Sequence, residues 1–203
     1  MKPLAYILLP LIQLSCSSPA ESVSSQEEPI RIEDMNEVKQ RYGIVGKVAP
    51  ELRVPTWVDG EGVEMDAPSI LDGQGKLRIL YCFQSWCPGC HSVGLPSLQK
   101  IVKAFEGNDQ IEFLAIQTVF EGFEANTYEK MIETQQKYDL HIPFGHDVGS
   151  EKTSNRSSTM YDYRTGGTPW FIFINRQGKV IFNDFHVDTE KAIDFLKQET
   201  KEE

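Results

Sequence analysis

A run of seven almost entirely apolar residues leads into a pair of cysteines, and this succession restricts the fold more than any other feature of the chain. Residues 77–83 read LRILYCF and residues 85–90 read SWCPGC. An apolar run of this length is typical of a strand that is covered on both faces. The residues after it predict a helix from about Cys87 to Phe105, bent at Pro96. The chain is therefore expected to bring both sulfurs to the point where a buried strand ends and a helix begins.

This position indicates a reactive pair. Unpaired N–H groups at a helix start, together with the helix dipole, stabilise a thiolate and lower the pKa of a thiol. The thiolate is the attacking species, so Cys87 is expected to form a mixed disulfide with a partner and Cys90 to resolve it. A disulfide that closes so short a loop constrains the unfolded chain little, which makes a purely structural role the weaker explanation.

A metal site and a third redox thiol are the alternatives for the sulfurs. A structural zinc site needs several Cys or His ligands at short spacings, but Cys16 lies near the N-terminus and Cys82 lies inside the apolar strand. His141 and His146 are five residues apart, which we interpret as a coincidence within a loop. No metal is therefore expected. Cys82 is interpreted as a small buried hydrophobe, with a redox thiol within reach of Cys87 as the alternative.

The remaining pattern alternates strands and helices and ends in a hairpin followed by a helix. Further strands are expected at 111–117, 142–148, 170–174 and 179–185, helices at 126–138, 154–163 and after Asp188, and a hairpin at 52–58 and 62–65. Asn126 with Glu129 is a capping-box variant, and Asp188 is the expected cap of the last helix. The pattern predicts an α/β fold in which a mixed central β-sheet carries helices on both faces, with an N-terminal hairpin and an inserted helix and strand.

The N-terminus differs in composition from everything after it. Residues 4–14 (LAYILLPLIQL) are too few for a spanning helix but are typical of a secretory signal. Cys16 follows in a context that resembles a bacterial lipoprotein lipidation site, although Gln13 stands where an aliphatic residue is usual, so ordinary signal-peptide cleavage is the alternative. We divide the chain into a lipoprotein-like signal peptide (1–15), a tether with a short helix at 33–42 (16–44) and a folded domain (45–203). Export permits disulfides.

The charge of the chain excludes one large class of partners. The formal net charge is -10 and the pI is about 4.9. No basic stripe is available to neutralise phosphates. Nucleic acid is therefore not an expected partner.

Several motifs together resemble the thioredoxin superfamily. They are Trp86-Cys87-Pro88-Gly89-Cys90 after an apolar strand, Pro96 in the same helix, Gly167-Thr168-Pro169 before a strand, and Asn175-Arg176-Gln177-Gly178-Lys179 in a hairpin. The upstream hairpin, the additional helix and strand at 126–148 and the exported anchor are similar to the TlpA/ResA group of thiol-disulfide oxidoreductases. The resemblance covers about residues 45–200.

The resemblance implies roles for residues around the pair. Pro169 is expected to be a cis-proline that faces Cys87 and Cys90. Thr168 would then offer its backbone to an extended substrate segment. Trp86 and Pro88 complete the substrate-orienting set, with Trp86 as part of an apolar rim. Ordinary packing is the alternative for Trp86 and Thr168.

The implied activity is thiol-disulfide exchange through the CPGC dithiol, with no organic cofactor or metal. The implied partners are cysteine-containing exported proteins and a redox partner protein. The implied location is the bacterial cell envelope, facing the periplasm, with a lipid on Cys16 as the membrane anchor. Pro88 is met in the more oxidising members of the superfamily, whereas the group resemblance suggests a reductant, so the direction of electron flow stays open.

The sequence departs from its relatives at positions that would handle the proton of Cys90. Tyr81 stands where thioredoxins carry a buried acid, and Val93 stands where ResA-like proteins carry a glutamate. His91, one helical turn after Cys87, is a candidate for lowering the pKa of that thiol. An ordinary solvated helix position is the alternative for His91.

Two other functions stay open. A thiol peroxidase of the peroxiredoxin type would carry a threonine three residues before its reactive cysteine, where this chain has Gln84. A metal chaperone or binding module on the same fold would space its cysteines more widely, although His186 offers a further ligand.

Overall fold

The centre of the molecule is a mixed sheet, as predicted. A computed structural model describes residues 42–71, 75–149 and 156–201. The seven strands lie in the order β2-β1-β5-β4-β3-β6-β7. They are β1 (Thr56–Val58), β2 (Glu64–Met65), β3 (Leu77–Phe83), β4 (Ile111–Val119), β5 (Phe144–Val148), β6 (Trp170–Ile174) and β7 (Val180–Asp184). β4 runs parallel to β3 and β5, and the other neighbours are antiparallel.

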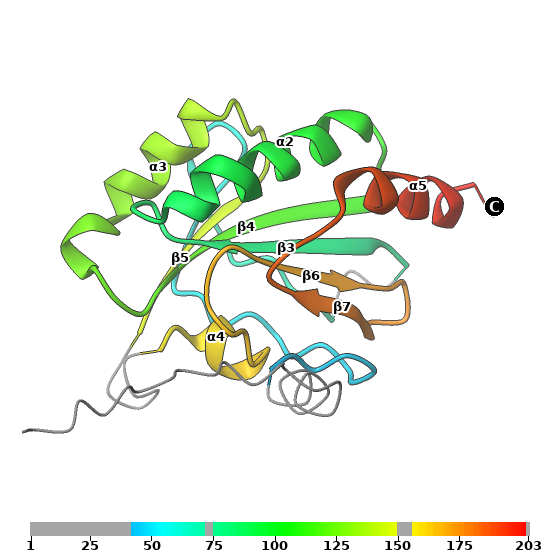
Figure 1. Ribbon diagram of the computed structural model, residues 1–203, viewed down its shortest axis with the longest axis horizontal. Coiled ribbons are helices and arrows are strands. Elements are labelled where there is room, and N and C mark those ends of the chain that lie inside the picture. The colour runs from blue at the N-terminus through cyan, green and yellow to red at the C-terminus, as the bar shows by residue number, and fades with distance from the viewer. Residues whose placement is uncertain (1–41, 72–74, 150–155, 202–203) are drawn as a thin grey trace, which may run out of the picture.

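Helices cover both faces of the sheet, which confirms the predicted fold class. They are α2 (Leu95–Ala104), α3 (Tyr128–Lys137), α4 (Ser158–Asp162) and α5 (Thr189–Glu199), with a π-helical turn at Cys90–Gly94 and a 3-10 turn at Phe123–Ala125. In Figure 1, α2, α3 and α5 lie along one face of the sheet, and α4 lies along the other together with residues 42–55. We call these the α2 face and the α4 face.

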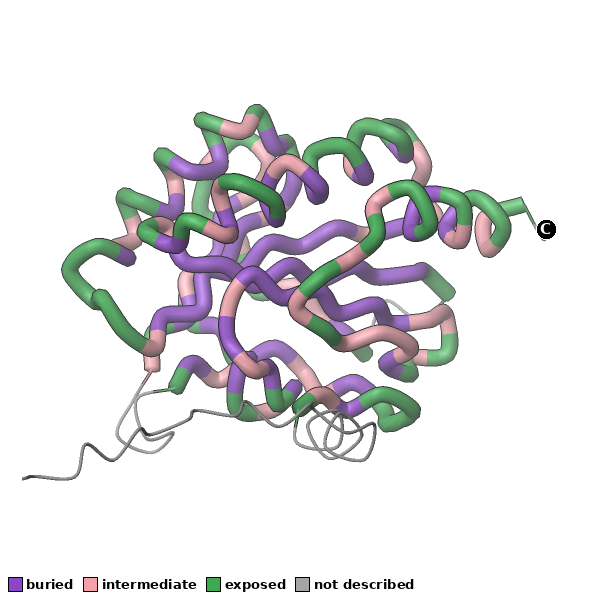
Figure 2. Tube along the Cα trace, in the orientation of Figure 1, coloured by how far each residue is buried: buried purple, intermediate pink, exposed green. Residues whose placement is uncertain are grey.

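β3 shows why the sheet needs two cores. All of its residues are buried, and Figure 2 shows buried strands enclosed by helices with exposed outer sides. Side chains alternate between the faces of a strand. Alternate β3 residues accordingly join the core on the α2 face (Leu77, Ile79, Tyr81, Phe83) or the core on the α4 face (Leu80, Cys82).

The helix predicted after the cysteines is present. The sequence predicts a bend at Pro96, and the structure has a π-helical turn just before that residue. Helical residues begin at Pro88, and the Leu95 N–H donates to the Cys90 carbonyl, which makes a π-helical turn. Pro96 has no N–H to offer to the preceding turn. A π-helical turn just before the proline is one way to accommodate that gap in the hydrogen-bond ladder.

The start of α3 differs by one residue from the prediction. Thr127, not Asn126, is the N-cap, and its side chain accepts from the Lys130 N–H. Asn126 instead donates to the carbonyls of Glu121 and Gly122, at 3.0 and 2.9 Å. Both residue types cap helices well. The carbonyl groups of the preceding loop engage Asn126, which leaves Thr127 as the cap. The sequence does not reveal this requirement of the loop.

Both predicted hairpins are present. β1 pairs with β2, over fewer residues than the predicted 52–58 and 62–65, and β6 pairs with β7. Asp188 caps α5 as predicted and accepts from the Lys191 N–H at 3.2 Å.

The predictions for the N-terminal residues stay predictions. The signal peptide (1–15), Cys16 and nearly all of the tether (16–44) with its helix lie outside the described residues. Among the described residues, no helix is both long enough and apolar enough to cross a membrane.

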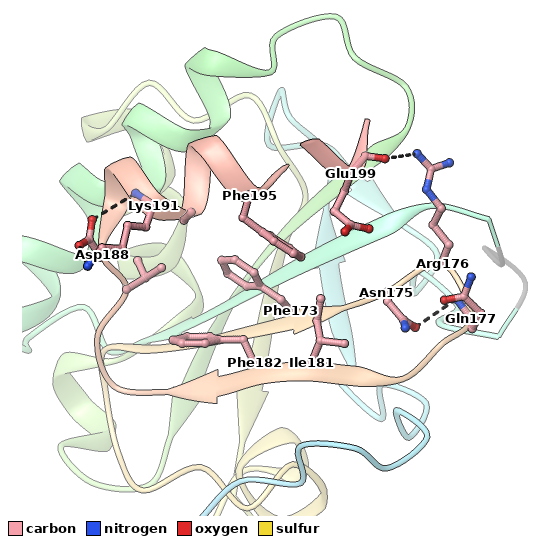
Figure 3. A pocket seen from close by; sticks show the side chains of 12 residues that line it. Phe173, Asn175, Arg176, Gln177, Ile181, Phe182, Asp188, Lys191, Phe195 and Glu199 are labelled. Atoms are coloured by element: carbon pink, nitrogen blue, oxygen red, sulfur yellow. Dashed lines mark hydrogen bonds and ion pairs between the residues drawn. The ribbon is translucent and has the colours of Figure 1, made fainter. Parts of the chain in front are cut away.

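A pocket of about 530 Å³ lies between α5 and the β6–β7 hairpin. Figure 3 shows Phe173, Phe182 and Phe195 at its centre and the Asp188–Lys191 ion pair at one end. No cysteine lines this pocket, so the reactive pair has to be sought at the end of β3.

Candidate active site

The two cysteines lie where β3 has ended and the chain enters the helix. The Cys90 N–H donates to Cys87 Sγ at 3.3 Å, and the Cys87 N–H donates to the Gln84 carbonyl at 3.1 Å. Both thiols are free. Cys87 is 8% exposed and Cys90 is 0% exposed. Both residues are buried, and Cys87 is the more exposed of the two.

The loop before β6 brings a second segment of the chain to Cys87. The Thr168–Pro169 peptide bond is cis, as expected. The Cys87 thiol donates to the Thr168 carbonyl, with 3.6 Å between Sγ and O, across 81 positions of sequence. Pro169 packs against the helix, because a Cβ added to Gly94 would come within 2.8 Å of the Pro169 Cβ.

Burial dominates the chemistry of Cys90. It raises the pKa of the Cys90 thiol to about 12, and a hydrogen bond with the Cys87 side chain adds to the rise. Hydrogen bonds with the Gln84 backbone and the Thr168 side chain act in the opposite direction. Cys90 is thus a protonated thiol at neutral pH, and its reaction requires that this proton be lost.

Trp86 forms an exposed apolar surface beside the pair. It is 45% exposed, and it rests on Gly122, where an added Cβ would come within 3.0 Å of Trp86 Nε1. Gly122 has a φ of 58°, a left-handed conformation that favours glycine. Pro88 and Val93 are exposed as well. Apolar surface next to a reactive thiol offers a place for a protein partner to dock.

His91 is anchored on both sides of its ring, unlike an ordinary solvated helix residue. Its Nε2 lies 2.6 Å from the Ser85 carbonyl and its Nδ1 lies 2.9 Å from Tyr138 Oη. Tyr138 Oη also donates to the His91 carbonyl at 3.1 Å. His91 therefore ties the end of α3 to the turn before Cys87. Its influence on the Cys87 pKa stays a prediction.

A buried polar cluster supports the turn before Cys87, and the sequence reasoning missed it. Ser85 Oγ donates to Gln117 Oε1, and Asn126 Nδ2 donates to Gln84 Oε1 at 3.3 Å. Gln117 Nε2 donates to the Asn126 carbonyl at 2.9 Å. The available signal was Gln117 itself, a polar residue in an apolar strand, because buried polar side chains need partners.

Cys82 lies on the other side of the sheet from the pair. It is 0% exposed and belongs to the core on the α4 face. Burial raises the pKa of its thiol above the usual range. This surrounding is that of a small buried hydrophobe.

The histidines considered as metal ligands have other partners. His141 pairs with Glu61 and Asp139 at 3.1 and 3.0 Å, and His146 Nδ1 lies 3.0 Å from Gln117 Nε2. In the part of the chain that the structure describes, no three or more His, Cys, Asp or Glu side chains gather as a metal site requires.

Solved structures of known proteins resemble this fold. A thioredoxin-like superfamily protein is 27% identical at a TM-score of 0.65, over 75% of this chain and 96% of its own. A thiol-disulfide isomerase from Corynebacterium glutamicum is 29% identical at a TM-score of 0.64, over 76% of this chain and 98% of its own. The thioredoxin domain of a thiol-disulfide oxidoreductase from Bacteroides vulgatus shares the fold at 17% identity and a TM-score of 0.56, over 76% of this chain and 96% of its own. No curated protein matches the chain.

The sequence also matches a protein family over most of its described length. The match spans residues 45–183 and is to the AhpC/TSA family. These residues include β3, the cysteine pair and the loop with the cis-proline. The thioredoxin-like fold expected from the sequence is therefore confirmed, and the chain belongs to the AhpC/TSA family.

Proposed function

We propose that this chain is a thiol-disulfide oxidoreductase whose electrons pass through Cys87 and Cys90. The observation that carries the proposal is the arrangement of two free thiols, in which the Cys90 N–H points at Cys87 Sγ from 3.3 Å. Cys87, the more exposed residue of the pair, is the nucleophile, and Cys90 resolves the intermediate. The likeness to a thiol-disulfide isomerase at 29% identity supports the same chemistry.

The reaction with a partner disulfide has two steps. The Cys87 thiolate attacks one partner sulfur, so that a mixed disulfide forms and the other partner sulfur leaves as a thiolate. The Cys90 thiolate then attacks Cys87 Sγ, closes the Cys87–Cys90 disulfide and releases the second partner thiolate. Two electrons reach the partner, and the protons lost by Cys87 and Cys90 reach the leaving sulfurs through solvent. The same steps in reverse oxidise a partner dithiol.

The partner segment is held beside Cys87 by the loop before β6. Thr168 is half-buried at the surface, and its carbonyl accepts from the Cys87 thiol. When Cys87 is a thiolate, this carbonyl is released and accepts from the backbone of an extended partner segment. Trp86 and Pro88 supply exposed surface on which the partner's side chains rest, and Pro169 shapes the loop.

We further propose that the protein works in the bacterial cell envelope, facing the periplasm. Its partners are cysteine-containing exported proteins and a redox partner protein, and a lipid on Cys16 anchors it to the membrane. The support is the composition of residues 1–44, which combines a signal-like segment, a cysteine and a polar tether. Cys16→Ser should move the protein from the membrane fraction to the soluble fraction, whereas Cys82→Ala should not. A Cys16→Ser protein that stays with the membrane would contradict the anchor.

The reduction potential of the pair tests the activity. The full chain with Cys16→Ser is equilibrated in glutathione buffers, and alkylation of Cys87 and Cys90 is counted by mass spectrometry. A midpoint near about -270 mV marks an electron donor, and one near about -120 mV marks a disulfide-forming oxidant. A pair without any reversible transition would reject the proposed function.

A peroxide-consumption assay separates this activity from that of a thiol peroxidase. Gln84 is 1% exposed, and its Oε1 is engaged by Asn126, so it is directed into the polar cluster. We therefore expect no peroxide consumption beyond that of the reducing agent alone. Turnover that depends on Cys87 would favour the peroxidase.

A further inference from the structure

Tyr81 places a hydroxyl group beside the backbone of Cys90. Its side chain is 0% exposed and packs against the rings of Phe83 and Phe171, with centroids 5.9 and 4.8 Å away. Its Oη donates to the Cys90 carbonyl at 3.5 Å. That distance is longer than a normal O–H···O hydrogen bond, so the carbonyl satisfies the hydroxyl poorly.

Gly94 provides the space that this hydroxyl occupies. A Cβ added to Gly94 would come within 2.2 Å of Tyr81 Oη and within 2.8 Å of the Pro169 Cβ. Gly94 closes the π-helical turn that begins at Cys90. The Tyr81 hydroxyl thus lies in a confined space formed by the turn of Cys90 and by the cis-proline loop.

The protonation states of the Tyr81 phenol and the Cys90 thiol suit a hydrogen bond from the phenol to the sulfur. Cys90 must react as a thiolate, although burial raises the pKa of its thiol to about 12. Burial also raises the pKa of Tyr81 well above its usual range, and the charge of Cys90 and a hydrogen bond with its side chain raise it further. The phenol is therefore protonated at any pH at which the protein works. It can donate a hydrogen bond but cannot take the proton from Cys90.

We propose that the Tyr81 hydroxyl donates a hydrogen bond to Cys90 Sγ as its thiolate forms and thereby accelerates resolution of the mixed disulfide. This inference rests on the proposed function, because it concerns the second step of that reaction. In that step the Cys90 proton leaves to solvent, Cys90 Sγ bonds to Cys87 Sγ, and the bond between Cys87 Sγ and the partner sulfur breaks. The partner sulfur carries away the electron pair, and Tyr81 keeps its proton throughout.

Other groups also act on the Cys90 thiol, so the test has to separate their effects from that of Tyr81. The Gln84 backbone and the Thr168 side chain also hydrogen-bond to Cys90. The titratable neighbours are Cys87 on the same turn, Cys82 on β3 and Tyr138 at the end of α3. Tyr81→Phe keeps the ring and loses only the hydroxyl, and it leaves the contacts of Gln84 and Thr168 with Cys90 in place.

The test separates the two steps by their leaving groups. The reduced full chain with Cys16→Ser is mixed with excess dithiobis(nitrobenzoate), a disulfide that releases one thionitrobenzoate when Cys87 is modified and a second when Cys90 displaces the first adduct. A hydrogen bond to a charged sulfur predicts that Tyr81→Phe slows the second phase about 10-fold to 100-fold and leaves the first phase unchanged. The rate of the second phase is followed from pH 6 to pH 9, where it should rise with the thiolate fraction in both proteins (about tenfold per pH unit).

Two further variants keep the test decisive. Tyr163→Phe is the matched control, because it removes a buried hydroxyl that donates to the Pro50 carbonyl at 2.6 Å on the α4 face. It should leave both phases unchanged. Tyr81→Met also lacks the hydroxyl and fills irregular space, so it replaces Tyr81→Phe if that variant does not fold.

The outcomes distinguish the inference from the function beneath it. A folded Tyr81 variant with a normal second phase would overturn the inference, and so would equal slowing of both phases, which marks a structural effect on the whole turn. Absence of a second phase in the parent protein would instead reject the proposed oxidoreductase.

Discussion

The two faces of the sheet contain the same residue types in different chemical situations. Each has a fully buried tyrosine and a fully buried cysteine: Tyr81 with Cys90 on the α2 face, and Tyr163 with Cys82 on the α4 face. Tyr163 Oη donates to a backbone carbonyl at 2.6 Å. Tyr81 Oη meets its carbonyl only at 3.5 Å. A well-made hydrogen bond stabilises structure, whereas a poorly made one leaves the donor available to a reacting atom.

Adjacent residues repeat the contrast between the faces. On β5, His146 approaches Gln117 on the α2 face. Its neighbour Asp147 accepts from the backbone N–H groups of Ser158 and Thr159 in the first turn of α4, at 3.0 and 2.8 Å. The α4 face therefore uses its polar groups to fix the chain, and the α2 face gathers them around a reactive turn. Substitutions on the two faces should separate stability from redox activity.

The largest effect is expected from the cysteines. Cys87→Ala should abolish exchange with glutathione, because it removes the attacking sulfur. Cys82→Ala should retain exchange within about twofold, since it removes only a small buried group. Thiol equilibration followed by mass spectrometry measures both. Equal losses in the two variants would show that the α4 face takes part in the chemistry.

A substitution at Gly94 should damage the α2 face through packing. In Gly94→Ala the new Cβ would lie 2.2 Å from Tyr81 Oη, so the turn or the tyrosine must shift. We expect a loss of about 3 kcal/mol in the free energy of unfolding, measured by urea denaturation. Gly89→Ala is the control, because its Cβ would meet only Pro169, at 3.4 Å, and it should be nearly neutral. Similar losses in both would mean that Tyr81 does not fill the space beside Gly94.

Substitution of Asp147 should destabilise the α4 face without abolishing thiol exchange by the cysteine pair. Asp147→Ala leaves the backbone N–H groups of Ser158 and Thr159 without the carboxylate that accepts from them, which we expect to cost about 2 kcal/mol of unfolding free energy. Asp188→Ala removes the exposed cap of α5 and should cost about 1 kcal/mol. Exchange of the cysteine pair should persist in both. Loss of exchange in a folded Asp147→Ala protein would contradict the separation of the faces.

The smallest effect concerns the pH dependence of stability. Burial lowers the pKa of His146 from its ordinary value of 6.5, so the fold favours the neutral ring. Below that value the unfolded chain binds the proton more readily, and stability falls as the pH falls. His146→Asn should reduce this acid sensitivity in urea titrations between about pH 7.5 and pH 5.5.

His141 provides the comparison for that titration. Hydrogen bonds with Glu61 and Asp139 raise its pKa, so its contribution is present at low pH and is lost as the pH rises through the raised pKa. His141→Asn should therefore increase the acid sensitivity slightly, opposite to His146→Asn. The same direction of change in both variants would show that burial does not govern His146.

Much of the fold could be predicted because single residue types decided it locally. The apolar run at 77–83 coincides with β3, Asp188 caps α5, and the hairpin of β6 and β7 follows the predicted strands closely. The Cys87 and Thr168 segments could be expected to meet because their motifs resembled a known superfamily. Each of these features depends on short-range chemistry or on a specific motif.

The features that escaped prediction depend on which distant atoms meet. Asn126 and Thr127 are both good caps, and the carbonyl groups of the preceding loop decided the outcome. The sequence predicts His91 as a modulator of Cys87 or as a solvated helix residue, and it does not reveal the contact with Tyr138, 47 positions away. In the sequence, Tyr81 is notable only because it replaces an acid that thioredoxins carry. In the structure, its hydroxyl lies beside the Cys90 carbonyl and fills the space next to Gly94.

The two edges of the sheet bear on aggregation and on how partners approach. β2, at one edge, has only 2 residues. At the other edge, Gly46 and Lys47 hydrogen-bond to the start of β7, through Val180, at 2.8 and 2.9 Å. Short or covered edges resist pairing with strands of other chains, which is how aggregation begins. For the proposed oxidoreductase, we therefore expect a partner strand to pair with the backbone at Thr168, because β2 is short and the start of β7 is already paired.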